Sequence, residues 1–376
     1  MSFKKQIRNI HKWLGLTSGL IVFIVSVTGC LFCFHDEIKD ITRKDARFVV
    51  RENKPYLPPS VLIEKAKLSV VPGSKCNTVV YVAPNRSAVV YTSSPEGFKY
   101  VFMNPYNGKT LFIEDPTTDF FIIVEYIHLY LLLPDYIGKH IIAGATIIFI
   151  FMLITGIIQW WPKRKSDIKR SFNVKWSAKW RRVNYDWHNV SGFYIAIIAL
   201  ILAITGLSFA YDWVGDGIYY TANLGKGDKE SELKAPTIDS TKYAAISITA
   251  ADYAMAATMK SNPKAAMFYI TIPEKKGEPL NTGAYQHVLR FDHQSNFYFH
   301  PADGKLLKSE PYEKKSFGLQ LNEMNYGLHT GQILDLPGKI IAFTASLIAA
   351  ALPVTGFIIW YGRRKKSKKN KFPARN

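Results

Sequence analysis

The chain has 376 residues, of which 48% are hydrophobic and 20% charged, and its formal net charge is +19. Apolar residues gather in four runs of 21 to 23 residues that contain no Asp, Glu, Lys or Arg, and about 20 such residues are enough for a helix to cross a bilayer. This pattern excludes a soluble enzyme, a disordered chain and an outer-membrane barrel. The four runs are Trp13–Phe34, Ile141–Trp161, Asn189–Tyr211 and Ile340–Tyr361.

The first half of the chain is predicted to place a folded domain between two membrane helices. Residues 1–35 form the N-terminus and the first transmembrane helix, 36–119 an α+β domain outside the membrane, and 120–162 an interfacial helix and the second transmembrane helix. The domain prediction rests on a helix-like segment followed by β-rich segments between turn residues. These are a helix at Pro58–Val70 and strands at Thr78–Ala83, Ala88–Thr92 and Tyr100–Met103.

The second half is predicted to repeat this order. It comprises a basic loop at 163–187, a third transmembrane helix at 188–212, a second α+β domain at 213–315, an interfacial helix and fourth transmembrane helix at 316–362, and a basic tail at 363–376. The second domain is expected to hold a helix at Ile248–Ser261 and strands at Ala266–Ile272, Tyr285–Asp292 and Asn296–His300. The interfacial helices are expected at Phe120–Leu133 and Ser316–Asp335.

Three segments carry the entire net charge. The residues up to Lys12 contribute +4, Pro162–Asn189 contributes +7 and the tail from Gly362 contributes +8. Four spans put these segments on one side of the membrane, and the positive-inside rule makes that side cytoplasmic. The basic excess therefore indicates topology and contact with anionic lipid rather than nucleic-acid binding, because no DNA- or RNA-binding motif is present.

The first span admits a second interpretation as a lipoprotein signal. Its start is basic, and Val27-Thr28-Gly29-Cys30 is similar to a lipoprotein cleavage box. The apolar run continues beyond Cys30, however, and Thr205-Gly206 occupies the matching place in the third span, where no signal is possible. A membrane helix is the favoured interpretation.

The two halves share motifs at matching positions, which predicts an internal duplication. His11–Gly15 aligns with His188–Gly192, and Thr155–Arg164 aligns with Thr355–Arg364. Two spans per half keep both halves in the same orientation, so the repeat is parallel, about an axis along the membrane normal. Shared sites in such repeats lie between the halves.

Four of the nine histidines form two repeat-matched pairs. His11 and His188 lie at the cytoplasmic ends of the first and third spans, and His128 and His329 precede the second and fourth spans on the external side. A lone interfacial histidine is usually a solvated or headgroup contact, but four matched histidines at membrane depth favour a cofactor. Two imidazoles from facing helices can complete a six-coordinate haem iron. We therefore expect one haem per pair, and covalent attachment is excluded because the chain has no Cys-x-x-Cys-His motif.

Other residues leave their roles open. Gly15 and Gly192 follow their histidines at i+4, where a glycine either makes room for a macrocycle or lets helices pack closely. Lys139, Lys339, Arg181 and Arg182 either pair with haem propionates or contact the membrane surface. His35 and His140 have no matched partner, and the spacing of His287, His293 and His300 suits a metal site poorly.

The motifs together resemble the PepSY-associated transmembrane family, from about Ile10 to Arg364. They are His-x-Trp-Leu-Gly-Leu at His11, the Thr-Gly pairs near the span ends, Trp-Trp-Pro-Lys-Arg from Trp160 and Pro-Tyr-Asn-Gly-Lys from Pro105. The resemblance implies PepSY-like periplasmic domains in the bacterial inner membrane and two b-type haems, with His11, His128, His188 and His329 as iron ligands. Some members reduce ferric siderophores. Only His11 is followed by the family's frequent basic residue, Lys12.

The expected function is transmembrane electron transfer by a haem-dependent oxidoreductase. A separate cytoplasmic or membrane donor would supply electrons, and a ferric siderophore or similar Fe(III) chelate would be reduced outside. One alternative is a membrane-anchored PepSY module that binds a peptide or a protease without redox activity. The other is a transporter that uses the histidines as a proton relay, which the lack of acidic residues within the spans disfavours.

Overall fold

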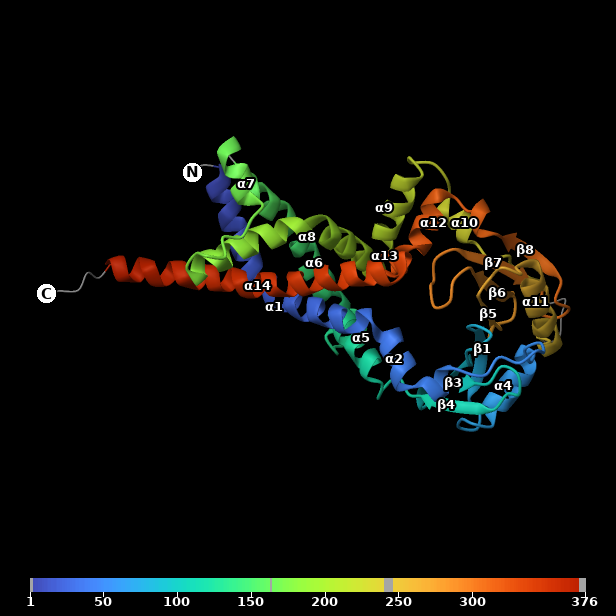
Figure 1. Ribbon diagram of the computed structural model, residues 1–376. Helices are drawn as coiled ribbons and strands as arrows, with labels where there is room; N and C mark the ends of the chain where they lie inside the picture. Colours follow the sequence, from blue (N-terminus) through green and yellow to red (C-terminus); the bar gives the residue numbers. More distant parts are fainter. Residues whose placement is uncertain (1–2, 163, 240–245, 372–376) are drawn as a thin grey trace. The chain divides into compact units, whose positions relative to one another are not determined.

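The computed structural model describes residues 3–162, 164–239 and 246–371, and its elements are labelled in Figure 1. The chain divides into two compact units, each built from segments that are distant in sequence. The helical unit comprises Met1–Phe34, Ile123–Val214 and Leu328–Asn376, and the sheet unit comprises His35–Ile122 and Gly215–Gly327.

Four long helices make up most of the helical unit, and each is long and apolar enough to cross a membrane. Helices α1 and α8 each pack against both α6 and α14. The four predicted spans are thus confirmed as helices, and together they indicate a multi-pass membrane protein. Their bounds are α1 Phe3–Cys33, α6 Asp135–Trp160, α8 Trp180–Ala210 and α14 Asp335–Lys371.

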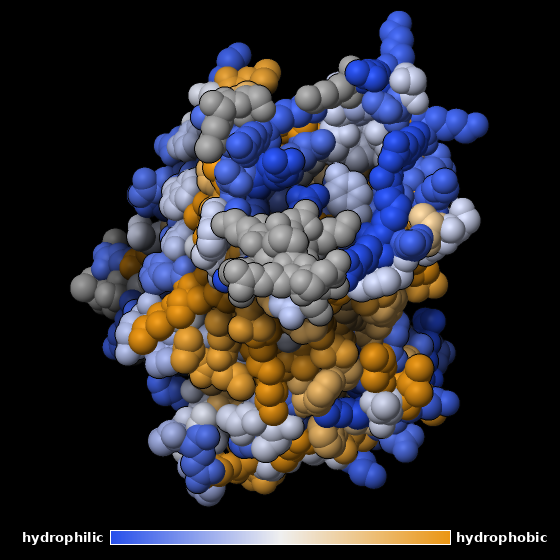
Figure 2. Space-filling model, turned by 90° about the vertical axis from the view of Figure 1, so that its left-hand side faces the viewer, coloured by the Kyte–Doolittle hydropathy of each residue, from blue (hydrophilic) through white to orange (hydrophobic). Residues whose placement is uncertain are grey.

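The helical unit has small residues inside and large apolar residues outside. Ala199, Ala345 and Ala349 are buried where the helices meet, and small side chains let membrane helices approach closely. Large apolar side chains such as Leu20 and Ile197 are instead 72% and 71% exposed, and hydrophobic side chains gather on the surface of the molecule (Figure 2). This inside-out distribution is suited to a lipid surrounding.

The sheet unit contains one antiparallel sheet of eight strands in the order β4-β3-β2-β1-β5-β6-β7-β8. Each of the two segments between the long helices contributes four consecutive strands, and they join where β1 pairs with β5, with Val79 opposite Ile270. The sequence predicted two separate α+β segments but not this shared sheet. The strands are β1 Lys75–Tyr81, β2 Ala88–Ser94, β3 Gly97–Met103, β4 Thr110–Glu114, β5 Met267–Thr271, β6 Leu280–Tyr285, β7 Gln294–Phe299 and β8 Leu306–Glu310.

One hydrophobic core serves both halves of the sheet. Helices α4 (Pro59–Lys67) and α11 (Ile248–Ser261) contact each other and the strands beneath them. Ile63 and Met255 from these helices join strand residues such as Val90 in a single buried cluster. Full burial of one aliphatic side chain contributes roughly 1.5 to 3 kcal/mol, so this cluster holds the two segments together.

The remaining helices are short and connect these elements. In chain order they are α2 His35–Thr42, α3 Lys44–Arg47, α5 Phe120–Tyr130, η1 Lys165–Asp167, α7 Ile168–Ser171, α9 Asp212–Ala222, α10 Lys229–Leu233, η3 Tyr312–Lys314, α12 Phe317–Glu323, α13 Asn325–Thr330 and η4 Gln332–Leu334.

Two sequence predictions were wrong in detail. Residues 286–292 of the strand expected at Tyr285–Asp292 form no strand, because the chain turns there through positive φ at Leu289 and His293, and β6 lies before them at Leu280–Tyr285. The single helix expected at Ser316–Asp335 is broken into three short ones, with Gly331 at φ 79° before the last. Strands β4 and β8 were not predicted.

A buried ion-pair cluster fixes α2 to the end of β4 and to the turn before α5. Lys39 lies 3.2 Å from Glu114 and 3.1 Å from Asp119, and Arg43 pairs with both carboxylates. Burial alone would raise the pKa of Asp119, but the hydrogen bonds and charges of Lys39 and Arg43 hold it below its usual range. The stability that this carboxylate contributes is therefore present at neutral pH and is lost as the pH falls through its lowered pKa.

We expect Lys39→Met to loosen this part of the sheet unit. Removing one partner of a buried ion pair leaves charge without compensation and costs about 3 to 5 kcal/mol. In the full-length protein, amide hydrogen exchange of β4 should accelerate at pH 7 relative to wild type. The difference should shrink as the pH falls, because without Lys39 the Asp119 carboxylate takes up a proton at a higher pH than in wild type. Lys44→Met, at an exposed neighbouring lysine, is the control, and an equal effect of both would contradict the prediction.

Candidate functional site

The structure brings the four repeat-matched histidines together in two pairs within the helical unit. His11 of α1 and His188 of α8 have ring centres 6.4 Å apart with planes at 89°. His128 of α5 and His329 of α13 have ring centres 6.0 Å apart with planes at 66°. The first is called the basic-end pair, since its helices begin beside the basic segments, and the second the opposite pair. The pairing is the one that the sequence predicts.

Each histidine is held by a threonine from a neighbouring helix. The Nδ1 atom of His11 lies 2.9 Å from the hydroxyl of Thr155. The other three Nδ1–hydroxyl contacts have the same form: His128 to Thr28 at 3.1 Å, His188 to Thr355 at 2.8 Å and His329 to Thr205 at 3.0 Å. Each pair is thus held by two threonines, one for each ring, and each threonine belongs to a different helix from the histidine it contacts.

The threonines determine which ring nitrogen carries the proton. Each hydroxyl donates its only hydrogen to a carbonyl one turn earlier in its own helix, at 2.7 to 3.0 Å, so it can only accept from the histidine. His128 Nδ1 also lies 3.0 Å from the carbonyl of Val25, which has no proton to give. Nδ1 is therefore the donor in all four rings, and in the neutral form of each ring the lone pair lies on Nε2. Among the described residues, none of these Nε2 atoms has a hydrogen-bond partner.

The glycine after each threonine makes room for the same ring. A Cβ atom placed at Gly206 would lie 3.0 Å from Cε1 of His329, and one at Gly356 would lie 3.3 Å from Cε1 of His188. At Gly29 and Gly156 the corresponding distances are 3.4 and 3.5 Å. Cε1 is the ring atom next to Nδ1, so one Thr-Gly dipeptide supports one edge of the imidazole. A Cβ would be tight against the ring at Gly206 and Gly356, whereas at Gly29 and Gly156 it would make an ordinary van der Waals contact.

The separation of the rings in both pairs fits two imidazoles that bind one metal ion, such as a haem iron. A metal–imidazole nitrogen bond is about 2.0 Å and the ring centre lies about 1.1 Å behind the nitrogen, so two imidazoles on one metal have ring centres roughly 6 Å apart. The observed separations of 6.4 and 6.0 Å agree. A neutral ring whose Nδ1–H is engaged and whose Nε2 is free is also the protonation state that a metal ligand requires.

The two pairs lie at different levels of the helical unit. Along α1, the stretch from His11 to Thr28, which holds His128, rises about 25 Å at ~1.5 Å per residue. Both residues belong to the same continuous helix. One planar group cannot contact both pairs, so the arrangement provides two sites.

Of the two roles considered for Gly15 and Gly192, the structure supports close packing of helices. A Cβ at Gly15 would lie 3.0 Å from the methyl carbon of Met152, and one at Gly192 would lie 3.6 Å from Leu352. Both neighbours are side chains of other helices. Of the residues considered as propionate partners, Arg182 pairs instead with the buried carboxylate of Asp186 at 2.7 Å, and Lys339 is only 6% exposed.

The other five histidines have local partners. His140 lies 2.8 Å from the Tyr211 hydroxyl, and His293 is paired with Asp292 at 2.8 Å. His35 and His300 lie within 3.4 Å of Asp36 and Asp303, and His287 packs edge-on against His293. In the described parts of the chain, no group of three or more His, Cys, Asp or Glu residues is arranged to hold a metal ion.

Sequence reasoning found the histidines but missed their threonine partners. The signal was present, because Thr-Gly occurs near one end of each of the four spans, at Thr28, Thr155, Thr205 and Thr355. In the sequence alone this dipeptide indicates the duplication and the family resemblance, but not a contact with the histidines. Each threonine holds a histidine of another helix, a relation that sequence position does not reveal.

Comparison with known families agrees with the architecture. The model of the PepSY-associated TM region matches residues 8–363, so the chain belongs to this family. No curated protein matches the chain significantly.

Proposed function

We propose that this protein is a di-haem electron-transfer protein of the bacterial inner membrane that reduces a ferric siderophore or another Fe(III) chelate in the periplasm. The observation that supports it most strongly is the presence of two histidine pairs with ring centres about 6 Å apart, each ring held through Nδ1 by a threonine. His11 and His188 would hold one b-type haem, and His128 and His329 the other. The haem would supply one-electron chemistry that amino-acid side chains lack.

The residues of the chain would position and tune the cofactor rather than react. Each Thr–His hydrogen bond holds the proton at Nδ1, orients the ring and makes Nε2 more basic, as outer-shell partners of metal ligands do. Apolar helix surfaces exclude water and lower the local dielectric, which sets the reduction potential. No general base or nucleophile is needed.

The direction of transfer follows from the distribution of charge. The three segments that carry the whole net charge of +19 lie at the ends of the spans nearest His11 and His188, and the positive-inside rule assigns that side and both termini to the cytoplasm. His128 and His329 would then lie on the periplasmic side, with the PepSY-like domains. Fe(II) binds hydroxamate and catecholate chelators far less well than Fe(III), so reduction would release iron for uptake.

We also infer that the two halves are a parallel internal duplication. The order of one helix, four strands, a short helix and a long helix occurs in residues 59–160 and again in residues 248–371, where four short helical segments, η3, α12, α13 and η4, take the place of the single α5. Both histidine pairs and all four Thr-Gly dipeptides fall at repeat-matched positions. A duplication explains why both histidine pairs take one ring from each half and why every ring has the same Thr-Gly support.

The first prediction concerns cofactor content. The purified protein should carry two non-covalent b-type haems in a pyridine haemochrome assay. His11→Ala or His188→Ala should remove one haem and spare the other, and His128→Ala or His329→Ala should do the reverse. His140→Ala, at a histidine outside both pairs, should retain two. Absence of haem from correctly folded wild-type protein would leave the PepSY binding module as the better explanation.

A second prediction concerns the threonines. Thr155→Val keeps the shape of the side chain but removes the acceptor for His11 Nδ1, so haem affinity of the basic-end pair should fall by about 10- to 100-fold, as for other outer-shell partners. Transfer of haem to apomyoglobin measures this affinity. Thr155→Ser should restore it. Thr146→Val, on the same helix but bonded only to its own backbone, should have no effect, and a similar loss there would refute the role assigned to Thr155.

A third prediction concerns the side of the reaction. Dithionite-reduced protein is sealed in proteoliposomes of known orientation, and a ferric siderophore too polar to cross lipid is added outside. The haems should be reoxidised only when the sheet unit, and not the C-terminal tail, faces the chelate. Equal reoxidation from the tail side would place the acceptor in the cytoplasm. No reoxidation by any ferric chelate would assign another acceptor class.

A further inference from the structure

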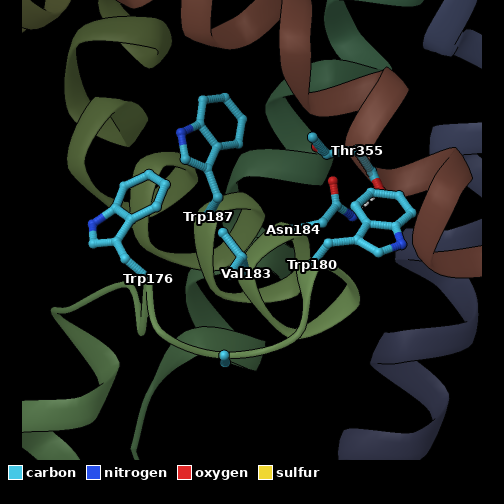
Figure 3. Close-up of a pocket in the computed structure, with 7 residues that line it drawn as sticks. Trp176, Trp180, Val183, Asn184, Trp187 and Thr355 are labelled. Atoms are coloured by element: carbon cyan, nitrogen blue, oxygen red, sulfur yellow. Dashed lines mark hydrogen bonds between the residues drawn. The ribbon is translucent and has the colours of Figure 1, made fainter.

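We propose that a tryptophan-lined cavity beside His188 binds the ring of a membrane quinone. The cavity is an open groove at the start of α8 with a volume of about 410 Å³ (Figure 3), and two of its tryptophans, Trp176 and Trp180, are 71% and 61% exposed. The volume is within the roughly 300 to 1,000 Å³ typical of small-molecule sites. Its lining residues are Trp176, Ala178, Trp180, Val183, Asn184, Trp187 and Thr355.

The walls of the cavity offer flat aromatic surfaces and a fixed amide. Figure 3 shows Trp176 and Trp187 on one side and Trp180 with Asn184 and Thr355 on the other, with Val183 between them. Indoles provide stacking faces and an N–H donor each. Asn184 Nδ2 donates to the carbonyl of Thr355 at 3.2 Å, which holds the amide in place and leaves its Oδ1 as an acceptor. A planar ring with two oxygens matches this set.

The cavity has no charged lining residue, which favours a neutral ligand over one that carries a phosphate. All seven lining residues are uncharged, although the segment Pro162–Asn189 contains nine basic residues. A flavin nucleotide or another phosphate-bearing carrier would need a cation at its phosphate, whereas a neutral quinone does not. The charge-free run of the third span begins at Asn189, so an isoprenoid tail can extend from the cavity into lipid.

One residue belongs both to the cavity and to the basic-end pair. Thr355 lines the cavity, and its hydroxyl lies 2.8 Å from Nδ1 of His188. A ring bound between the indoles is therefore separated from the histidine by a single side chain. The quinone site is adjacent to the site of the proposed function rather than elsewhere on the helix.

Electron supply through this cavity rests on the proposed function, whereas quinone binding does not. Oxidation of one quinol to quinone breaks its two O–H bonds and releases two electrons and two protons. Two ferric haem irons of the proposed function would each take one electron and become ferrous. The protons would pass to water on the side of the basic segments.

The competing explanation is a belt of interfacial tryptophans, which anchor many membrane proteins. Trp13 and Trp161 serve as internal controls, because they lie near the same ends of α1 and α6 and are 59% and 65% exposed, close to the 61% of Trp180. Neither lines the cavity. If the tryptophans only anchor the protein in the membrane, replacing any of them should have the same effect. If the cavity binds a quinone, only the tryptophans that line it should affect binding.

The test is photolabelling of the full-length protein in lipid nanodiscs with a short-chain azidoquinone. The label should map to the peptide containing residues 176–187 and should be displaced by decylubiquinone but not by FMN. Trp180→Ala should weaken labelling about two- to tenfold, the range for loss of one aromatic contact, and Val183→Trp should abolish it by filling the cavity. Trp161→Ala should leave it unchanged. Thermal unfolding and haem content of each variant confirm that it folds.

Several results would overturn the proposal. They are labelling outside residues 176–187, equal labelling of Val183→Trp and wild type, displacement by FMN alone, or a label that appears only in haem-free His188→Ala protein, which would show the cavity to be part of the haem site. The pyridine haemochrome assay separates the two hypotheses. Labelled protein without haem would refute the proposed function only, and haem-loaded protein without label would refute the quinone site only.

Discussion

The hydrogen bond from histidine Nδ1 to a threonine hydroxyl is the interaction on which the candidate site depends. In an apolar interior an unpaired imidazole N–H would be costly. The threonine can serve only as an acceptor because its own hydrogen is bonded within its helix. Protonation state, ring orientation and the free lone pair on Nε2 all follow from this one contact.

The same contact explains why a residue without a bulky side chain suits the position after threonine. A hydrogen bond of about 3 Å draws the imidazole edge onto the helix that carries the threonine, and adjacent ring atoms then meet the next residue. At Gly206 a Cβ would already be only 3.0 Å from the ring of His329. In each Thr-Gly dipeptide the threonine supplies the polar contact and the glycine allows close approach, two features that usually come from separate positions of membrane helices.

Much of this organisation is predictable from sequence because it is local or periodic. The four spans follow from charge-free runs, and the pairing of His11 with His188 follows from repeat position and topology. What could not be predicted depends on contacts between distant segments. The pairing of β1 with β5 could not be predicted, because the composition of neither strand indicates its partner. Strand β6 contains Asn281 and Gly283, which disfavour strands locally, yet pairing with β5 overrides this preference.

Both the histidine pairs and the eight-stranded sheet need residues from the two halves of the chain. Each histidine pair takes one ring from each half, and the sheet is continuous only because β1 of the first half pairs with β5 of the second. A single half would leave an unpaired strand edge, which promotes association with other chains, and one imidazole where two are needed. Because each half lacks what the other supplies in both units, neither half alone completes the candidate site or the sheet.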